Sequence, residues 1–373
     1  MHVSLVQGAA RCLLAVLLAW TWQAGAAEVR TLAGRGAARC DGDGGPALEA
    51  GVHNPFGVVV GPDGAVYVCE VGGHVIRRID RATGIASTIA GLADQPGWSG
   101  DGGPAKDARL NEPYEIRFDA QGDLYVVEMQ NHLVRKIEAR TGLISTVAGR
   151  GRAGFSGDGG PAIDAEFRQP HSIVLAGEAG LLICDIGNHR IRRVDLNSGR
   201  ASTFAGNGAR TATPDGAPLD GTPLNGPRAL DFDGQDSLYL ALREGNAVYR
   251  IDLTRGTLHH IAGSGKQGFT GDGGDARQAT LAGPKGIAVG PDGDVYLADT
   301  ENHAIRVIRR KSGIIETIVG DGQPGDGPDG DPLRCRLSRP HGVFVDAVGR
   351  VLIGDSENHR VREFVPEAAA PAR

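Results

Sequence analysis

A recurring proline is followed by side chains whose chemistry could hold a ligand. It stands at positions 55, 113, 170, 227, 284 and 340. The residues after it differ between copies while their surroundings repeat, and a fold demands the same residue in every copy, so function is expected where copies differ. The candidate binding residues are Phe56, Tyr114, Glu115, His171, Arg228, Lys285 and His341. Aromatic rings beside cations suit an anionic or sugar-like ligand, or an acidic peptide end.

The same residues support a second hypothesis, an enzyme. His171 or His341 would be a base or metal ligand near Tyr114 and Arg228, as in a lyase or lactonase. However, the sequence shows no Ser-His-Asp arrangement and no metal-ligand spacing. We therefore predict a binding site with no catalytic residue and no cofactor, with a metal ion in a central channel as the alternative. Protonation of either histidine, near a pKa of about 6.5, is expected to strengthen anion binding.

The spacing of the prolines defines the elements that carry these residues. Successive prolines are separated by 58, 57, 57, 57 and 56 residues. Each unit contains four short β-branched runs separated by Gly turns, as at 286–289, 295–298, 304–308 and 315–319. One such sheet cannot bury both faces, so the copies must stack. The sequence predicts an all-β fold, a six-bladed β-propeller of four-stranded blades.

The two ends of the chain are expected to share one blade. The sixth unit supplies only three strands, whereas residues 29–33 resemble the fourth strand of the other units. We predict that this N-terminal strand completes the last blade, so that the propeller spans residues 28–366 and that blade has no open edge. An incomplete seventh blade is the alternative.

A histidine, an acid and an arginine recur around the second and third strands. The histidines are His74, His132, His189, His303 and His359, and each blade supplies one, so we expect them to bond their own turn or the adjacent blade rather than a shared metal. The acids Glu70, Glu128, Asp185, Asp299 and Asp355 precede the arginines Arg77, Arg135, Arg192, Arg250, Arg306 and Arg362. A ladder of Arg–carboxylate pairs linking the blades is expected, and an anion site is the alternative.

The fourth unit departs from this pattern. By residue type, Arg243 replaces its acid and Ala247 its histidine, and its loop at 206–226 lacks the repeated Gly-Asp-Gly-Gly core. Either the blade has decayed or it serves a partner.

Four loops carry Gly-Asp-Gly-Gly or a close relative, with aspartates at 43, 101, 158 and 272. The glycines permit turns with positive φ, and the aspartate can accept local N–H groups, which favours a rigid turn. Calcium is the alternative, for which Asp41 and Asp43 form the best candidate pair.

The cysteines fall into two groups. Cys69 and Cys184 occupy the same place late in a second strand and are expected to be free and buried. Cys40 and Cys335 lie in loops of the first and sixth units, which a closed ring makes neighbours. A Cys40–Cys335 disulfide and two free thiols both fit the sequence.

Composition narrows the class of protein and its location. The net charge of −6 argues against nucleic acid as a partner. Residues 1–27 contain a short apolar run and an Ala-Gly-Ala site, typical of a signal peptide, and no segment is long enough to span a membrane. We expect a secreted or periplasmic monomer, with residues 367–373 as a disordered tail.

The segments around the histidines resemble the NHL repeat, named for Asn-His-Leu, a triplet found here at 131–133. The resemblance extends over residues 28–366, and its glycine-rich loops look like the NHL propeller of teneurins and of bacterial exported proteins. The family implies binding more often than catalysis, though some related propellers are lyases or lactonases. The leading hypothesis is a binding module for a protein, peptide or glycan on the looped face.

Overall fold

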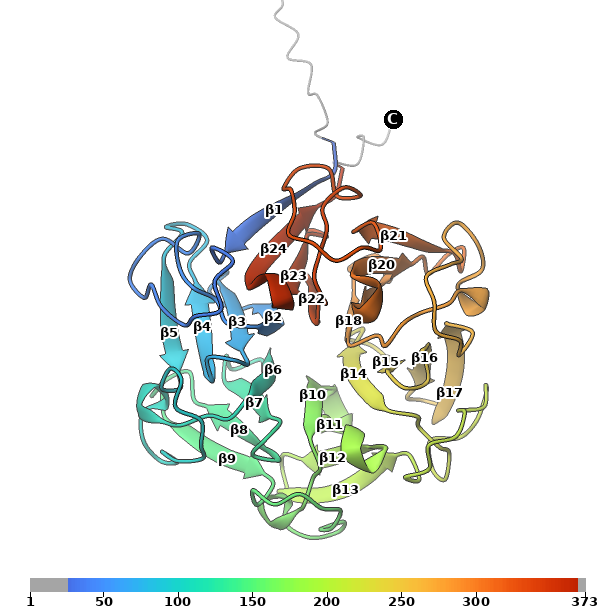
Figure 1. Cartoon of the computed structure of the whole chain (residues 1–373). Coiled ribbons are helices and arrows are strands. Elements are labelled where there is room, and N and C mark those ends of the chain that lie inside the picture. The colour runs from blue at the N-terminus through green and yellow to red at the C-terminus, as the bar shows by residue number, and fades with distance from the viewer. Residues whose placement is uncertain (1–25, 368–373) are drawn as a thin grey trace, which may run out of the picture.

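Six four-stranded antiparallel sheets surround a central axis (Figure 1) in the computed structural model, which describes residues 26–367. The predicted six-bladed β-propeller is confirmed. From the axis outward, blades one to three are formed by β2 (Pro55–Val60), β3 (Val66–Glu70), β4 (Val75–Ile79) and β5 (Ala86–Ala90); β6 (Pro113–Phe118), β7 (Leu124–Glu128), β8 (Leu133–Ile137) and β9 (Ile144–Ala148); and β10 (Pro170–Leu175), β11 (Leu181–Asp185), β12 (Arg190–Asp195) and β13 (Arg200–Ala205).

The remaining blades follow the same order. They are formed by β14 (Pro227–Phe232), β15 (Ser237–Leu242), β16 (Ala247–Asp252) and β17 (Thr257–Ala262); β18 (Gly286–Val289), β19 (Val295–Asp299), β20 (Ala304–Ile308) and β21 (Ile315–Val319); and β22 (Gly342–Val345), β23 (Val351–Asp355), β24 (Arg360–Val365) and β1 (Glu28–Ala33). Short 3-10 turns stand between some of them: η1 (Ala105–Asp107), η2 (Ala162–Asp164), η3 (Gly177–Ala179), η4 (Ile186–Asn188), η5 (Ala276–Gln278), η6 (Thr300–Asn302) and η7 (Ser356–Asn358).

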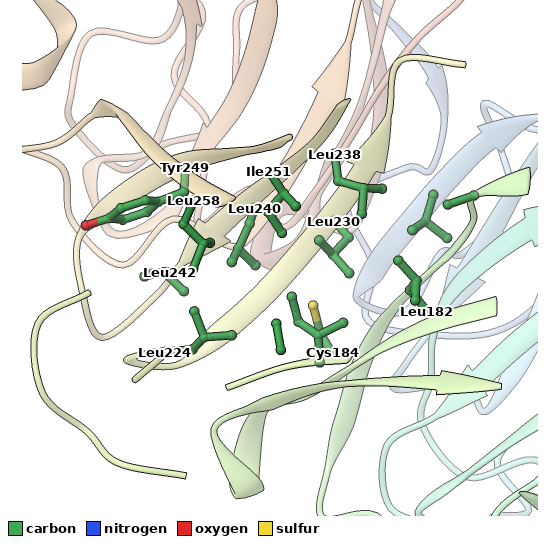
Figure 2. Close-up of a cluster of buried hydrophobic side chains, with 14 of the residues drawn as sticks. Leu182, Cys184, Leu224, Leu230, Leu238, Leu240, Leu242, Tyr249, Ile251 and Leu258 are labelled. Carbon is green, nitrogen blue, oxygen red and sulfur yellow. The ribbon is translucent and has the colours of Figure 1, made fainter. Parts of the chain in front are cut away.

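The hydrophobic core lies between neighbouring blades. Between blades three and four, Leu182 and Cys184 pack against Leu230 and Leu240, all with less than 1% of their surface exposed (Figure 2). Each fully buried aliphatic side chain of this kind contributes about 1.5–3 kcal/mol. Because both faces of each sheet are covered in this way, the strands carry apolar residues on both sides and do not alternate strictly.

The N-terminal strand closes the ring as predicted. β1 pairs antiparallel with β24, with Val29 opposite Phe364 and Thr31 opposite Arg362. Asp329, in the loop that leads to blade six, accepts the Thr31 backbone N–H at 2.8 Å. The two ends of the described chain are thereby held in one sheet.

The recurring histidines join each blade to the next. Each ring nitrogen Nδ1 accepts a backbone N–H from the residue before the following proline: His74 from Glu112, His132 from Gln169, His189 from Gly226, His303 from Arg339 and His359 from Asn54, at 3.1–3.3 Å. The expected contact with the adjacent blade is confirmed. In unit four Asn246, not Ala247, holds this position: its φ is +43°, and its side-chain oxygen accepts the Gly283 N–H at 2.8 Å.

The expected Arg–carboxylate pairs form, but they do not link blades. Each pair lies within one blade, with N···O distances of 3.3 Å for Arg77–Glu70, 3.6 Å for Arg135–Glu128, 3.6 Å for Arg192–Asp185, 3.4 Å for Arg306–Asp299 and 2.7 Å for Arg362–Asp355. The pairs stay within a blade because the arginine and the acid lie on neighbouring strands of one sheet.

The loop aspartates complete each pair. Asp101 contacts Arg135 at 2.6 Å and accepts the Thr146 hydroxyl of the outermost strand at 2.7 Å. Asp43 and Asp272 contact their arginines and accept a backbone N–H from the outer strand. The rigid-turn interpretation agrees with these contacts, since the carboxylate ties the arriving loop to the sheet.

Unit four exchanges the whole pair for apolar side chains. The register places Leu242 where the acid stands and Tyr249 where the arginine stands, so the assignment of Arg243 and Arg250 to these places was wrong. The Tyr249 hydroxyl donates to the Thr213 carbonyl at 2.6 Å, and both side chains belong to the buried cluster of Figure 2. Arg250 lies on the other face, with 32% of its side chain exposed. Such a joint exchange leaves no buried charge uncompensated.

The cysteines of the described chain are all free. Cys69 and Cys184 are buried, as expected. Cys40 and Cys335 form no disulfide: Cys40 lies beside Arg77, and Cys335 is buried in the cluster around Val29.

Two predicted segments lie largely beyond the described residues. Of the expected signal peptide, residues 1–25 fall outside them, as do residues 368–373 of the expected tail. Within residues 26–367, no helix has the length and apolar character needed to cross a membrane.

Candidate functional site

The residues after the anchor prolines meet at the centre of the ring. Phe56, Tyr114, His171, Arg228, Lys285 and His341 all border two cavities: one of about 510 Å³, and a second of only about 20 Å³. They therefore form a partition between the two. The larger, or upper, cavity is also lined by residues of the loops before the first strands and of the turns after the second strands.

Local backbone geometry turns these side chains toward the axis. In blades two, three and four the register between the first two strands shifts around Tyr114, His171 and Arg228, each of which follows its proline as the extra residue of a β-bulge. A bulge re-aims the side chain of its unpaired residue. The proline opens the strand, where its missing N–H costs no ladder hydrogen bond.

Aromatic rings form a continuous arc across the partition. The rings of Phe56 and His341 stack at 3.8 Å, Tyr114 meets Phe56 edge-on at 4.6 Å, and His171 meets Tyr114 at 4.4 Å. The rings of Phe56 and Tyr114 thus connect His341 to His171 along this arc.

Arg228 is a buried cation without a carboxylate partner. Only 3% of its surface is exposed. Its Nη2 donates to the Tyr114 hydroxyl, and its guanidinium lies 4.5 Å over the Tyr114 ring. Among residues 26–367 no carboxylate lies within 4 Å of it, and its buried Nε has no hydrogen-bond partner. Burial lowers the pKa of this arginine. A buried charge is costly unless paired, so the position favours an anion.

Lys285 is paired, in contrast. Its Nζ donates to Glu301 Oε1 at 2.7 Å, and Arg339 contacts the same oxygen at 2.9 Å. Burial lowers the pKa of Lys285 to about 8. Although burial opposes it, hydrogen bonds from Arg339 and Lys285 lower the pKa of Glu301 to about 2. The lysine is thus a cation that titrates close to neutral pH.

His341 is held neutral. Its Nδ1 lies 2.8 Å from the Arg339 carbonyl, which can only accept, so Nδ1 carries the proton and Nε2 faces Lys285 Nζ at 3.4 Å. Burial, together with the charges of Lys285 and Arg228, sets the pKa of His341 well below its usual value. The expectation that this histidine strengthens anion binding near pH 6.5 was therefore wrong: it gains no proton there.

Glu115 differs from the other predicted residues in the cavity that it lines. It borders the small cavity and not the upper one, and its carboxylate contacts Arg117 at 2.5 Å. Burial raises the pKa of Glu115 to about 7. Successive residues of a strand point to opposite sides, which agrees with Tyr114 reaching the upper cavity while Glu115 reaches only the small one.

Five charged residues of the upper cavity were missed in the sequence: Glu112, Arg210, Arg243, Glu244 and Arg339. Glu112 and Arg339 directly precede an anchor proline, and this position also varies between copies. Arg210, Arg243 and Glu244 belong to the irregular fourth unit, so this unit carries part of the cavity. Their departure from the repeat was the signal in the sequence that these residues could line a site. Residue type alone did not show that their side chains turn toward the upper cavity.

Comparison with known proteins agrees with this architecture. A family model described as the teneurin NHL domain matches residues 235–335, and one described as the NHL repeat matches residues 337–364. Residues 235–364 of this β-propeller are therefore similar to NHL-repeat proteins. The resemblance seen in the sequence is thereby confirmed.

The curated relatives that resemble this chain are larger proteins. Protein SUPPRESSOR OF QUENCHING 1, chloroplastic, from Arabidopsis thaliana is 27% identical over 70% of this chain and 25% of its own length. Human NHL repeat-containing protein 2 is 24% identical over 79% of this chain and 44% of its own length, and human teneurin-1 is 28% identical over 60% and 9%. The chain spans less than half the length of each of these relatives.

Solved structures share the fold at low identity. An auxiliary nutrient binding protein from Bacteroides ovatus matches with a TM-score of 0.67 and 17% identity, over 92% of this chain and 77% of that one. A virginiamycin B lyase variant from Staphylococcus aureus matches with a TM-score of 0.50 and 18% identity, over 83% and 80%. These likenesses show the propeller fold.

Within residues 26–367, no three His, Cys, Asp or Glu side chains are grouped so that they could hold an ion. The absence of a cofactor stays a prediction.

Proposed function

We propose that this β-propeller is an exported binding module that takes the anionic group of a peptide or glycan into its upper cavity. The observation that carries the proposal is Arg228, a buried guanidinium at the base of the cavity with no carboxylate partner in the described chain. An arginine fork binds a planar carboxylate through two parallel hydrogen bonds. A ligand carboxylate would supply the counter-charge that no residue of the described chain provides.

The size and charge of the cavity support a small ligand or a chain end. A volume of about 510 Å³ lies within the range of small-molecule sites. Five cations line the cavity against two acids: Arg210, Arg228, Arg243, Lys285 and Arg339 against Glu112 and Glu244. The faces and edges of Phe56 and Tyr114 offer a flat apolar wall on which a sugar or side chain can pack. Export is proposed from the signal-like segment at residues 1–27.

Matched ligands test the role of Arg228. Calorimetry would compare a dipeptide acid with its amide, and glucuronate with glucose, on the wild type, on Arg228→Met and on Arg140→Gln, an exposed control. We expect at least one acid to bind about tenfold or more tightly than its neutral partner. Arg228→Met should abolish that preference and Arg140→Gln should keep it. Equal binding of acids and neutral partners by the wild type would refute the proposal.

A propeller-type lyase or lactonase is the second candidate. The observation in its favour is that Lys285, with a pKa of about 8, and the Tyr114 hydroxyl lie at the same cavity, where they could accept and return a proton. Mass spectrometry of each bound probe after long incubation distinguishes the two functions. An unchanged probe supports a binding module, and a cleaved one supports an enzyme.

A further inference from the structure

Most charges around the upper cavity are neutralised within the protein. Arg243 contacts Glu244 at 2.8 Å, and Glu301 contacts Lys285 at 2.7 Å and Arg339 at 2.9 Å. Within residues 26–367, three cavity residues have no oppositely charged side chain within 4 Å: Arg210, Arg228 and Glu112. The cavity therefore presents an unpaired acid as well as unpaired cations.

Glu112 is held firmly at this place. It directly precedes Pro113, its φ of +51° lies in the left-handed region, and its N–H donates to His74 Nδ1 of blade one at 3.2 Å. A glutamate in this conformation is strained, and the contact between blades maintains it. Its half-buried side chain lines the same cavity as Tyr114, the hydrogen-bond partner of Arg228.

A sugar acid or an N-blocked peptide would satisfy only half of this arrangement. Its carboxylate would pair with Arg228, but Glu112 would remain a partly desolvated carboxylate without a cation, which is costly. A ligand that carries both charges would compensate both groups.

We infer that the ligand of the upper cavity is a zwitterion, a free amino acid or a short peptide, whose carboxylate meets Arg228 and whose ammonium meets Glu112. This inference rests on the proposed function, because it places the ligand in the same cavity. The volume of about 510 Å³ accommodates a molecule of this size, and the rings of Phe56 and Tyr114 flank its side chain.

The experiment uses alanyl-phenylalanine in four forms: unmodified, N-acetylated, C-amidated, and blocked at both ends. Calorimetry is performed on the wild type, on Glu112→Gln, and on Glu49→Gln, an exposed acid outside the cavity. Glu112→Asn serves as a second variant, because asparagine tolerates left-handed backbone. Thermal melting verifies that each variant is folded.

We expect the unmodified dipeptide to bind about tenfold or more tightly than the N-acetylated form. Glu112→Gln and Glu112→Asn should remove that difference, and Glu49→Gln should keep it. If N-acetylated peptide or glucuronate binds as tightly as the unmodified dipeptide, and still depends on Arg228, the zwitterion inference fails and the proposed function stands. If no carboxylate among the dipeptides and glucuronate binds, both fail.

Discussion

The protein contains two kinds of buried arginine, which differ in the side chains that they contact. Arg135 and its equivalents in four other blades each contact one carboxylate on the neighbouring strand and at least one in the loop. Arg228 is equally hidden, yet it contacts a tyrosine hydroxyl and no carboxylate in the described chain. Buried arginines that stabilise the fold are neutralised by carboxylates of the protein itself. The exception marks the position where, on the proposed function, a ligand would supply the counter-charge.

The pKa of Lys285 should make the proposed anion binding depend on pH. Below about pH 8 the lysine is a cation, and above it the cavity loses one positive charge, while Glu301 stays ionised and His341 stays neutral throughout. The affinity for a carboxylate ligand should therefore fall by about threefold to tenfold as the pH rises from 7 to 9. Calorimetry across this range checks the prediction on the wild type and on Lys285→Met. A pH profile for Lys285→Met that matches the wild type would contradict it.

At the scale of the strands, distance from the anchor proline decides the role of a residue. The buried acid stands 15 residues after the proline, the turn histidine 19 and the buried arginine 22, as Glu70, His74 and Arg77 do after Pro55. In unit four these distances lead to Leu242, Asn246 and Tyr249, which the register confirms. Matching by residue type pointed instead to Arg243, Ala247 and Arg250. Counting residues from the proline therefore gives the correct assignment from the sequence, whereas matching residues by type does not.

Arg306 and Arg250 form a matched pair that tests this assignment. Arg306 is fully buried and contacts Asp299 and Asp272, so Arg306→Ala should lower the free energy of unfolding by about 3–5 kcal/mol. Arg250 is partly exposed, and its nearest carboxylate is 3.9 Å away, so Arg250→Ala should cost less than about 1 kcal/mol.

Denaturant unfolding measures both effects. The double change Arg306→Tyr, Asp299→Leu copies unit four and should cost less than Arg306→Ala, because no buried charge is left unpaired. Equal losses for Arg306→Ala and Arg250→Ala would show that the distance rule is wrong.

For the molecule as a whole, the repeat made the fold predictable from the sequence. The positions where the copies differ made the candidate site only partly predictable. Six agreeing copies gave the blades and the closure by residues 29–33, since stacked units admit few arrangements. The same logic located the residues after the prolines. It could not show that Phe56 and Tyr114 would close the channel, that Glu115 would turn to the other side, or that Arg228 would lack a carboxylate. Those facts depend on side-chain contacts between blades far apart in sequence.

Closure of the ring has a measurable consequence. Removal of residues 28–33 unpairs β24 and uncovers part of the core around Val29, so the free energy of unfolding should fall by several kcal/mol. Glu28→Ala, an exposed change in the same strand, should have little effect. Denaturant melts of both variants make the comparison. A deletion variant as stable as the wild type would mean that β1 does not complete the ring.

We propose above that the upper cavity binds an anionic ligand through Arg228. The most direct measurement is a crystal structure of the protein with the tightest-binding carboxylate of the peptide and sugar panel. We expect the carboxylate within hydrogen-bond distance of the Arg228 guanidinium, above the rings of Phe56 and Tyr114. A ligand bound elsewhere, with Arg228 still bonded only to Tyr114, would contradict it.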